Sequence, residues 1–287
     1  MMPKKTNSTK IPTTILVLAK TLEFFSTKYA TLLAVKLFTT PVKYRMPNRE
    51  IEMDNNTSQK LLNVPEINKQ IMLYEYGNGS KKALLVHGWA GRGTQLYKIA
   101  SELVKNDYQV ISFDAPAHGK SSGSKTIMVE FIASILEIQK IYGTFDIAVG
   151  HSLGGMALIN SVNKNLKISK MVTIGAGNSV IDIIDDFIYK LQMKPIQTTL
   201  LKNYFEQKYN RTLDELSSVT NARKIEIPSL IIHDQNDDEV SVHCAYEIKK
   251  VLKNSSLMIT QKLGHRKILG ANDVLAKIID FVKIEKI

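Results

Sequence analysis

The chain has 287 residues, of which 44% are hydrophobic and 23% charged, as in an ordinary globular protein with a full core. Its formal charge of +11 comes from scattered lysines without a long basic block, which argues against a nucleic-acid-binding protein. The single cysteine, Cys244, excludes an intrachain disulfide and favours a reducing, cytoplasmic compartment. The sequence has no HExxH pair and no close His/Cys cluster, so we expect no metal site.

The N-terminal part of the chain is predicted to be helical. Residues 1–10 are polar and are expected to be disordered, whereas residues 11–38 are apolar but interrupted by charges. Only nine residues between Lys10 and Lys20 lack a charge, too few to span a bilayer. A polar stripe at helical spacing is formed by Lys20, Glu23, Thr27 and Thr31. We expect an amphipathic helix or helix pair that packs against the rest of the protein, with membrane-surface docking or a signal peptide as alternatives.

Residues 40–60 form a predicted polar linker that carries Pro41 and Pro47. We therefore divide the chain into an N-terminal helical extension and linker at 1–60 and a main domain at 61–287.

The main domain alternates predicted strands and helices. The strands are expected at 70–76, 83–87, 108–114, 145–150, 170–175, 229–233 and 256–260. The helices are expected at 94–105, 127–142, 153–162, 242–252 and 272–282. This alternation predicts an α/β fold, with a mostly parallel central sheet and helices on both faces.

The interval 176–224 breaks the alternation, because it has helical periodicity and no strand pattern. Apolar residues recur at i, i+3, i+7 and i+10 from Ile181 to Leu191. Further helical segments are expected at about 197–209 and 213–218. We expect a helical insertion here.

Gly150-His151-Ser152-Leu153-Gly154 lies between a predicted strand and a predicted helix. A serine framed by glycines at such a junction is typical of a nucleophile elbow, whose strained turn leaves little room for side chains two residues to either side. The alternative is a glycine-rich turn with a helix-capping serine. We interpret Ser152 as a catalytic nucleophile.

A second loop follows the predicted strand at 83–87 and contains His87-Gly88-Trp89-Ala90-Gly91. In an acyl-transfer enzyme such a loop donates one backbone N–H to the oxyanion, and the residue after the nucleophile donates the other. We assign these backbone roles to Trp89 and Leu153. The Trp89 side chain is expected to form a pocket wall or to pack in the core.

Two later segments carry the candidate acid and base. An acidic loop with Asp234, Asp237, Asp238 and Glu239 follows the strand at 229–233. His265 follows a glycine after the last predicted strand and is the candidate general base, with His118 as the second choice.

In this order, Ser…Asp…His, the chain resembles the α/β-hydrolase superfamily of serine esterases, lipases and aminopeptidases over about residues 69–282. The family pattern His-x-x-x-Asp-x-x-Val, matched by His233, Asp237 and Val240, implies that Asp237 is the acid. The insertion at 176–224 is similar to the small helical cap of this family. The resemblance implies that it lies over the nucleophile, and five of its residues are candidates for an apolar substrate pocket or for fastening the cap: Phe187, Tyr189, Met193, Tyr204 and Phe205.

The resemblance implies a serine hydrolase that cleaves a carboxylic ester or thioester through an acyl-enzyme and needs no cofactor. A peptidase or amidase on the same triad, and a small-molecule-binding protein with little turnover, remain alternatives. The expected partner is a small ester-type substrate, without nucleic acid. The expected location is the cytoplasm, with membrane association through the N-terminal helix as the alternative, and the sequence leaves the oligomeric state open.

Overall fold

The computed structural model describes residues 11–284, and the disorder predicted for residues 1–10 lies outside them. The sheet contains β1 (Ser58–Val64), β2 (Lys69–Tyr76), β3 (Lys81–Val86), β4 (Tyr108–Asp114), β5 (Phe145–His151), β6 (Ile168–Ile174), β7 (Ser229–Asp234) and β8 (Ser255–Thr260). The helices are α1 (Thr13–Phe25), α2 (Thr27–Thr39), α3 (Asn48–Asn55), α4 (Tyr97–Lys105), α5 (Met128–Tyr142), α6 (Leu153–Val162), α7 (Val180–Lys190), α8 (Ile196–Tyr209), α9 (Ser218–Ala222), α10 (His243–Val251), α11 (Gly264–Lys267) and α12 (Asn272–Lys283). Short 3₁₀ turns lie at Pro65–Ile67, Asp214–Leu216 and Ile268–Gly270.

The eight strands form one sheet in the order β1-β2-β4-β3-β5-β6-β7-β8. The first two strands pair antiparallel to each other, and β2 pairs antiparallel to β4. All pairs from β4 to β8 are parallel. The predicted α/β fold with a mostly parallel sheet is therefore confirmed. The carboxyl ends of the parallel strands lie at one edge of the sheet, where ligand sites of open α/β sheets form.

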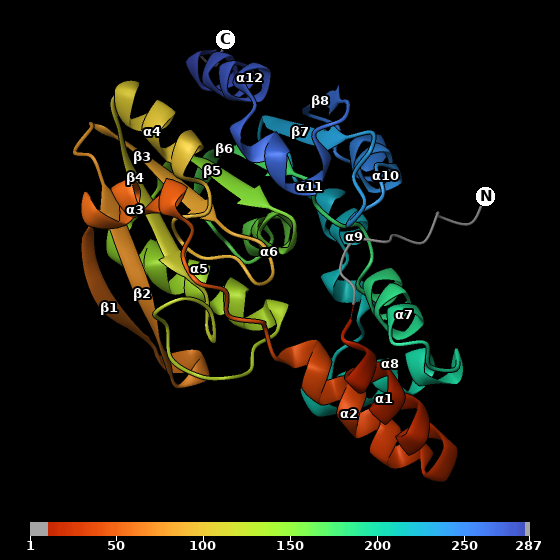
Figure 1. The fold of residues 1–287 in the computed structure, drawn as a ribbon. Helices are drawn as coiled ribbons and strands as arrows, with labels where there is room; N and C mark the ends of the chain where they lie inside the picture. The colour runs from red at the N-terminus through yellow and green to blue at the C-terminus, as the bar shows by residue number, and fades with distance from the viewer. Residues whose placement is uncertain (1–10, 285–287) are drawn as a thin grey trace.

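Helices cover both faces of the sheet, as Figure 1 shows. Alternate residues of β3 point to opposite faces, so that Leu84 and Val86 join one core cluster while Ala83 and Leu85 join the other. The first cluster packs against α5, α6 and α10, and the second packs against α4 and α12. The sheet is thus buried on both sides, which explains the nearly continuous apolar runs of its central strands.

Two elements lie in the segment that was predicted to be a linker. Pro47 precedes α3, whose Glu50 and Met53 are buried. β1 begins at Ser58, so the boundary placed at residue 60 falls inside this strand. The prediction missed β1 because most of its side chains remain partly or fully exposed at the sheet edge, which leaves only a weak apolar signal.

A separate helical lobe projects from the sheet (Figure 1) and combines α1 and α2 with α7 and α8 of the insertion at 176–224. A third core cluster joins these helices, with Ala30 and Ala34 from α2 packed against residues such as Ile188 and Leu201. Two hydrogen bonds also join them: the Lys194 N–H donates to Glu23 Oε1 at 2.9 Å, and the Thr31 hydroxyl donates to Gln197 Oε1 at 2.7 Å. Two residues of the predicted polar stripe therefore face the insertion. None of the described helices is long and apolar enough to cross a membrane.

Candidate active site

Ser152 lies in a sharp turn between β5 and α6 and has a φ of 53° and a ψ of −121°. A serine rarely adopts a positive φ, and the turn is held by the Ser152 N–H, which donates to the Ile174 carbonyl at 2.8 Å. The glycines are sterically required. A Cβ on Gly154 would lie 2.3 Å from the Val86 carbonyl oxygen, and a Cβ on Gly150 would lie 2.6 Å from the Gly154 carbonyl oxygen. The geometry is that of the turn expected from the sequence.

Asp237 and His265 come together from the loops that follow β7 and β8. The His265 Nδ1–H donates to Asp237 Oδ2 at 2.7 Å, and both side chains are buried. This bond fixes the imidazole ring and leaves Nε2 for another partner. Ser152 and His265 line the same cavity, so the structure brings the three predicted catalytic side chains into one region.

The Asp237 carboxylate is held ionised. Its Oδ1 accepts the N–H groups of Glu239 and Val240, each at 2.8 Å, and His233 Nε2 lies 3.4 Å from its Oδ2. Burial opposes ionisation, but the hydrogen bonds from His233 and His265 outweigh it and hold the pKa of Asp237 well below its ordinary value. Asp237 is therefore suited to stabilise a positive charge on His265.

The other acidic residues of this loop have different surroundings. Asp234 accepts hydrogen bonds from the Thr260 hydroxyl at 2.7 Å and from the Asn236 and Leu263 N–H groups at 2.9 and 3.1 Å. It therefore joins the two loops that carry Asp237 and His265. Asp238 is exposed.

The loop after β3 approaches Ser152 so closely that a Cβ on Gly88 would lie 2.9 Å from the Ser152 Cβ. Three of its amides have acceptors: Gly88 donates to Gln95 Oε1, Ala90 donates to His118 Nε2 and Gly91 donates to the Gly88 carbonyl. The Trp89 amide lies between them, and Trp89 and Leu153 both line the cavity beside Ser152. Their positions are compatible with the predicted backbone roles.

His118, the second-choice base, has both ring nitrogens engaged. Nε2 accepts the Ala90 N–H at 3.0 Å, and Nδ1 donates to the Pro116 carbonyl at 3.0 Å. Burial, with the neighbouring His87, lowers the pKa of His118 to about 3. Burial likewise lowers the pKa of His87 to about 4, and its Nε2 accepts the Ala115 N–H at 2.9 Å. Both histidines are therefore neutral, and their hydrogen bonds join the loop after β3 to the loop after β4. His118 is not placed to act as a base.

His151 lies beside His265. Its ring centroid is 4.6 Å from that of His265, and its Nε2 donates to the His265 carbonyl at 2.9 Å. Burial, with the adjacent His265, lowers the pKa of His151 well below its ordinary value. His151 is thus a neutral support for the His265 loop.

A cavity of about 1620 Å³ opens over Ser152, between the sheet and the helical lobe. Its apolar lining comes from both N-terminal helices and the insertion, and includes Ile15, Leu37, Phe38, Ile183 and Ile184. Of the five predicted pocket residues, only Phe187 and Phe205 line the cavity.

The three other pocket predictions are not supported by the structure. Met193 and Tyr204 pack in the core cluster that joins the insertion to α1 and α2, and Tyr189 is exposed on α7. Helical periodicity placed all of them on apolar faces, but the N-terminal helices cover one of those faces. Among residues 11–284, no group of three or more His, Cys, Asp or Glu side chains could hold a metal ion.

A model of the alpha/beta hydrolase fold family matches residues 84–191. A putative lipase from Acinetobacter baumannii AYE is 19% identical, with a TM-score of 0.63 over 84% of this chain and 97% of that one. An esterase from Pyrococcus furiosus is 17% identical, with a TM-score of 0.65 over 85% and 97%. A bacterial membrane phospholipase A is 17% identical, with a TM-score of 0.63 over 94% and 96%. No curated protein matches the sequence.

The chain has the α/β-hydrolase fold.

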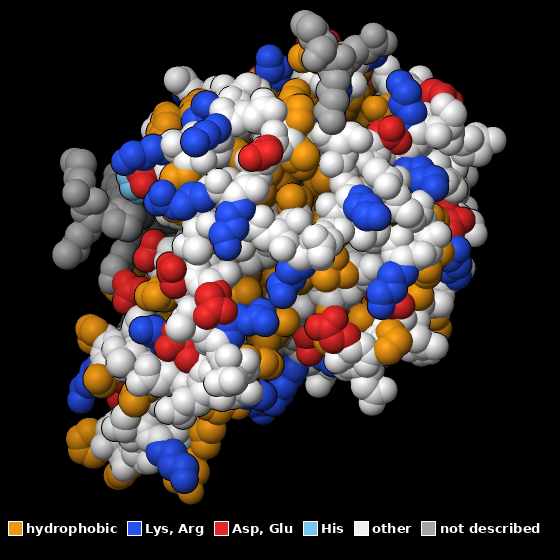
Figure 2. All heavy atoms as spheres, turned by 180° about the vertical axis from the view of Figure 1, so that it is seen from behind, with side chains coloured by type: hydrophobic (Ala, Val, Ile, Leu, Met, Phe, Trp, Pro, Cys, Tyr) orange, Lys and Arg blue, Asp and Glu red, His pale blue; other side chains and the backbone are white. Residues whose placement is uncertain are grey.

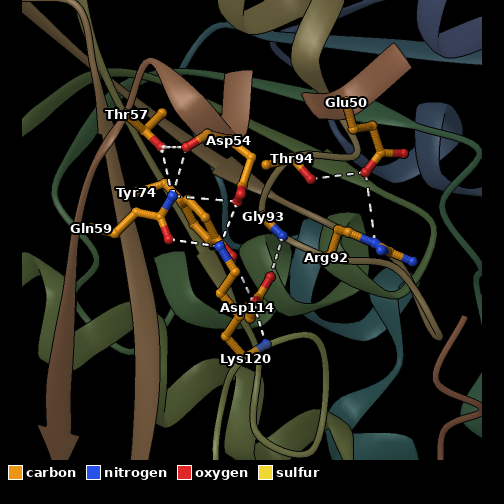
Figure 3. Close-up of polar contacts among 10 residues, drawn as sticks. All are labelled: Glu50, Asp54, Thr57, Gln59, Tyr74, Arg92, Gly93, Thr94, Asp114 and Lys120. Atoms are coloured by element: carbon orange, nitrogen blue, oxygen red, sulfur yellow. Dashed lines mark hydrogen bonds and ion pairs between the residues drawn. The ribbon is translucent and has the colours of Figure 1, made fainter. Parts of the chain in front are cut away.

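A polar network that the sequence did not reveal holds the loop after β3 in place, as Figure 3 shows. Asp114 at the end of β4 accepts the Gly93 and Lys120 N–H groups, each at 2.7 Å, and the Tyr74 hydroxyl at 2.9 Å. It thereby links the loops that follow β3 and β4.

Glu50 of α3 extends the same bracing (Figure 3). Its Oε2 accepts the Thr94 hydroxyl at 2.8 Å and lies 3.6 Å from Arg92 Nε. Burial raises the pKa of Glu50, although Thr94 and Arg92 favour its ionised form. An acidic residue in an apparently polar linker gave no sequence signal for this role.

Proposed function

We propose that this protein is a serine hydrolase that cleaves carboxylic ester or thioester bonds, with Ser152 as nucleophile, His265 as general base and Asp237 as its acidic partner. The observation that carries the proposal is the buried 2.7 Å hydrogen bond between His265 and Asp237, in the cavity where the strained turn presents Ser152. A capping serine would need neither the strain nor the paired histidine.

In the proposed reaction, His265 Nε2 takes the Ser152 proton while Oγ bonds to the substrate carbonyl carbon. The negative charge passes to the carbonyl oxygen, which the Trp89 and Leu153 amides hold. The histidine then returns the proton to the leaving alcohol or thiol as the C–O or C–S bond breaks. Water clears the acyl-enzyme by the same route, and Ser152 recovers its proton.

The cavity favours a long acyl chain over a small one. Its volume of about 1620 Å³ exceeds the usual range of small-ligand pockets, and Ile183, Ile184 and Phe187 supply an apolar wall from α7. The N-terminal helices supply a second apolar wall through Ile15, Leu37 and Phe38. A long hydrocarbon chain would remove these apolar surfaces from water.

The test is a series of p-nitrophenyl esters of increasing acyl length, measured as kcat/KM. We expect turnover that rises with chain length and falls by about four orders of magnitude in Ser152→Ala. Turnover by Ser152→Ala equal to the parent would refute the proposal. Labelling of Ser152 by a fluorophosphonate, without turnover of any ester or thioester, would instead favour a small-molecule-binding protein with little turnover.

A matched pair of variants tests whether the apolar wall from α7 selects the acyl chain. Ile183→Trp fills the cavity and should depress turnover of long-chain esters about tenfold or more while sparing the acetate ester. Tyr189→Trp lies on the same helix but outside the cavity, so its profile should match the parent. Identical chain-length profiles for both variants would remove the cavity from substrate selection.

A further inference from the structure

The outer side of the α1–α2 helix pair presents large apolar side chains to solvent. Phe24 and Phe25 are 84% and 79% exposed, the highest fractions among the exposed large hydrophobic residues described. We call the exposed apolar side chains of this pair the hairpin edge; they are Val17, Leu18, Phe24, Phe25, Tyr29 and Leu32. Figure 2 shows hydrophobic side chains gathered on this projecting lobe, at its lower left.

Helical spacing places the α1 members of the hairpin edge on one stripe. Val17 and Phe24 are seven residues apart, as are Leu18 and Phe25, so they recur after two turns. Ala19 of the same helix is fully buried in the core cluster that joins α1 and α2 to the insertion. Single exposed apolar residues are ordinary, but a gathered set marks a surface that contacts a partner.

The charges around the hairpin edge indicate the partner. Three lysines, Lys20, Lys28 and Lys36, are exposed on the two helices, against one glutamate, which gives a net charge of +2. The glutamate, Glu23, accepts the Lys194 N–H and so lies on the side of the insertion. Exposed aromatic rings flanked by lysines suit a surface that is apolar inside and anionic at its boundary.

The opposite side of the same two helices faces the cavity. Ile15 of α1 and Leu37 and Phe38 of α2 line the space that opens over Ser152. The helix pair therefore connects a solvent-exposed apolar edge with an apolar wall of the site. Both sides of the helix pair are apolar. One side packs against the insertion and faces the cavity, whereas the hairpin edge is exposed to solvent.

From this arrangement we propose that the hairpin edge docks on the surface of an anionic lipid bilayer. Phe24 and Phe25 enter the boundary between headgroups and acyl chains, and Lys20 and Lys28 contact lipid phosphates. A second copy of the chain is a poorer occupant, because pairing two hairpin edges would bring the lysines of both copies together. The inference concerns binding and does not require the proposed chemistry.

The test is co-sedimentation of the full-length chain with phosphatidylcholine vesicles, with and without phosphatidylglycerol. We expect pelleting only with the anionic vesicles and a loss of pelleting as salt rises from about 0.1 M to about 1 M. The Phe24→Ser/Phe25→Ser and Lys20→Gln/Lys28→Gln variants should each bind about tenfold or more weakly. Ser152→Ala should pellet like the parent, which separates docking from turnover.

Two control variants change exposed residues elsewhere on the surface. Leu61→Ser/Ile141→Ser removes apolar side chains from the sheet edge and α5, and Lys250→Gln/Lys253→Gln removes positive charge near α10. Both controls should bind like the parent. Failure of the parent to pellet, or equal binding by the Phe24→Ser/Phe25→Ser variant, would overturn the proposal, as would a concentration-dependent dimer that this variant abolishes.

Discussion

Asp237 and His265 are 28 residues apart in the chain, yet Asp237 Oδ2 and His265 Nδ1 are joined at 2.7 Å. Parallel β7 and β8 end side by side and bring the two loops together. Asp234 then ties these loops through Thr260 and Leu263. Asp234, at the end of β7, and Asp237, in the loop after it, therefore have separate tasks: Asp237 orients the histidine, and Asp234 holds the loops after β7 and β8 together.

The three aspartates should respond differently to conversion to asparagine. Asp237→Asn should lower kcat by about three to four orders of magnitude, because a neutral asparagine cannot stabilise the positive charge on His265. Its melting temperature should change little. Asp234→Asn should lower the melting temperature but reduce kcat only slightly. Exposed Asp238→Asn should change neither the melting temperature nor kcat. Ester kinetics and thermal melting separate these outcomes. A larger loss of kcat in Asp238→Asn than in Asp237→Asn would contradict the assignment.

Buried neutral histidines predict acid lability. The pKa values of His87, about 4, and His118, about 3, lie below the ordinary 6.5, so the unfolded chain binds more protons below pH 6.5. Stability should therefore fall as pH falls from 6.5 towards 4, by up to about 1.4 kcal/mol per pH unit for each residue.

His118→Gln tests this pH dependence, because the glutamine carbonyl can still accept the Ala90 N–H. Urea unfolding at a series of pH values should show a shallower slope for this variant between pH 6.5 and 4. Exposed His243→Gln is the control. The prediction fails if His118→Gln retains the full slope of the parent.

The turn at Ser152 should not tolerate a methyl group at Gly154. Gly154→Ala should lower the free energy of unfolding by at least about 3 kcal/mol, because the added Cβ would lie 2.3 Å from a backbone oxygen. Gly143→Ala is the comparison: its added Cβ would meet no atom within 4 Å, so only its backbone conformation, with φ 74° and ψ −141°, costs about 1–3 kcal/mol. Equal losses in the two variants would mean that the turn is not as close-packed as described.

Glu50 is predicted to support the loop after β3. Glu50→Ala leaves Arg92 and the buried Thr94 hydroxyl without this partner and should destabilise the protein by about 1–3 kcal/mol. Glu52→Ala, on the exposed side of the same helix, should stay within about 0.5 kcal/mol of the parent. Denaturant unfolding compares them, and indistinguishable midpoints would remove Glu50 from the bracing network.

The sequence predicted features that depend on local pattern. The turn at Ser152 was recognisable because its glycine spacing is a steric requirement, and the parallel strands because burial on both faces produces long apolar runs. Features set by tertiary contact were missed. Phe187 and Tyr189 are two residues apart on α7, yet only Phe187 lines the cavity. The covering of one apolar face by α1 and α2, and the bracing by Glu50, depend on segments far apart in the chain.

The most direct test of the account is labelling with a fluorophosphonate, followed by intact-mass analysis and peptide mapping. A single adduct is predicted on the peptide that contains Ser152, absent from Ser152→Ala and strongly slowed in His265→Ala. The reagent forms a covalent bond with a serine only when that serine is activated, so it reports on the site without any assumption about substrate. An adduct on another residue, or labelling of Ser152→Ala at the rate of the parent, would contradict the assignment of Ser152 as nucleophile.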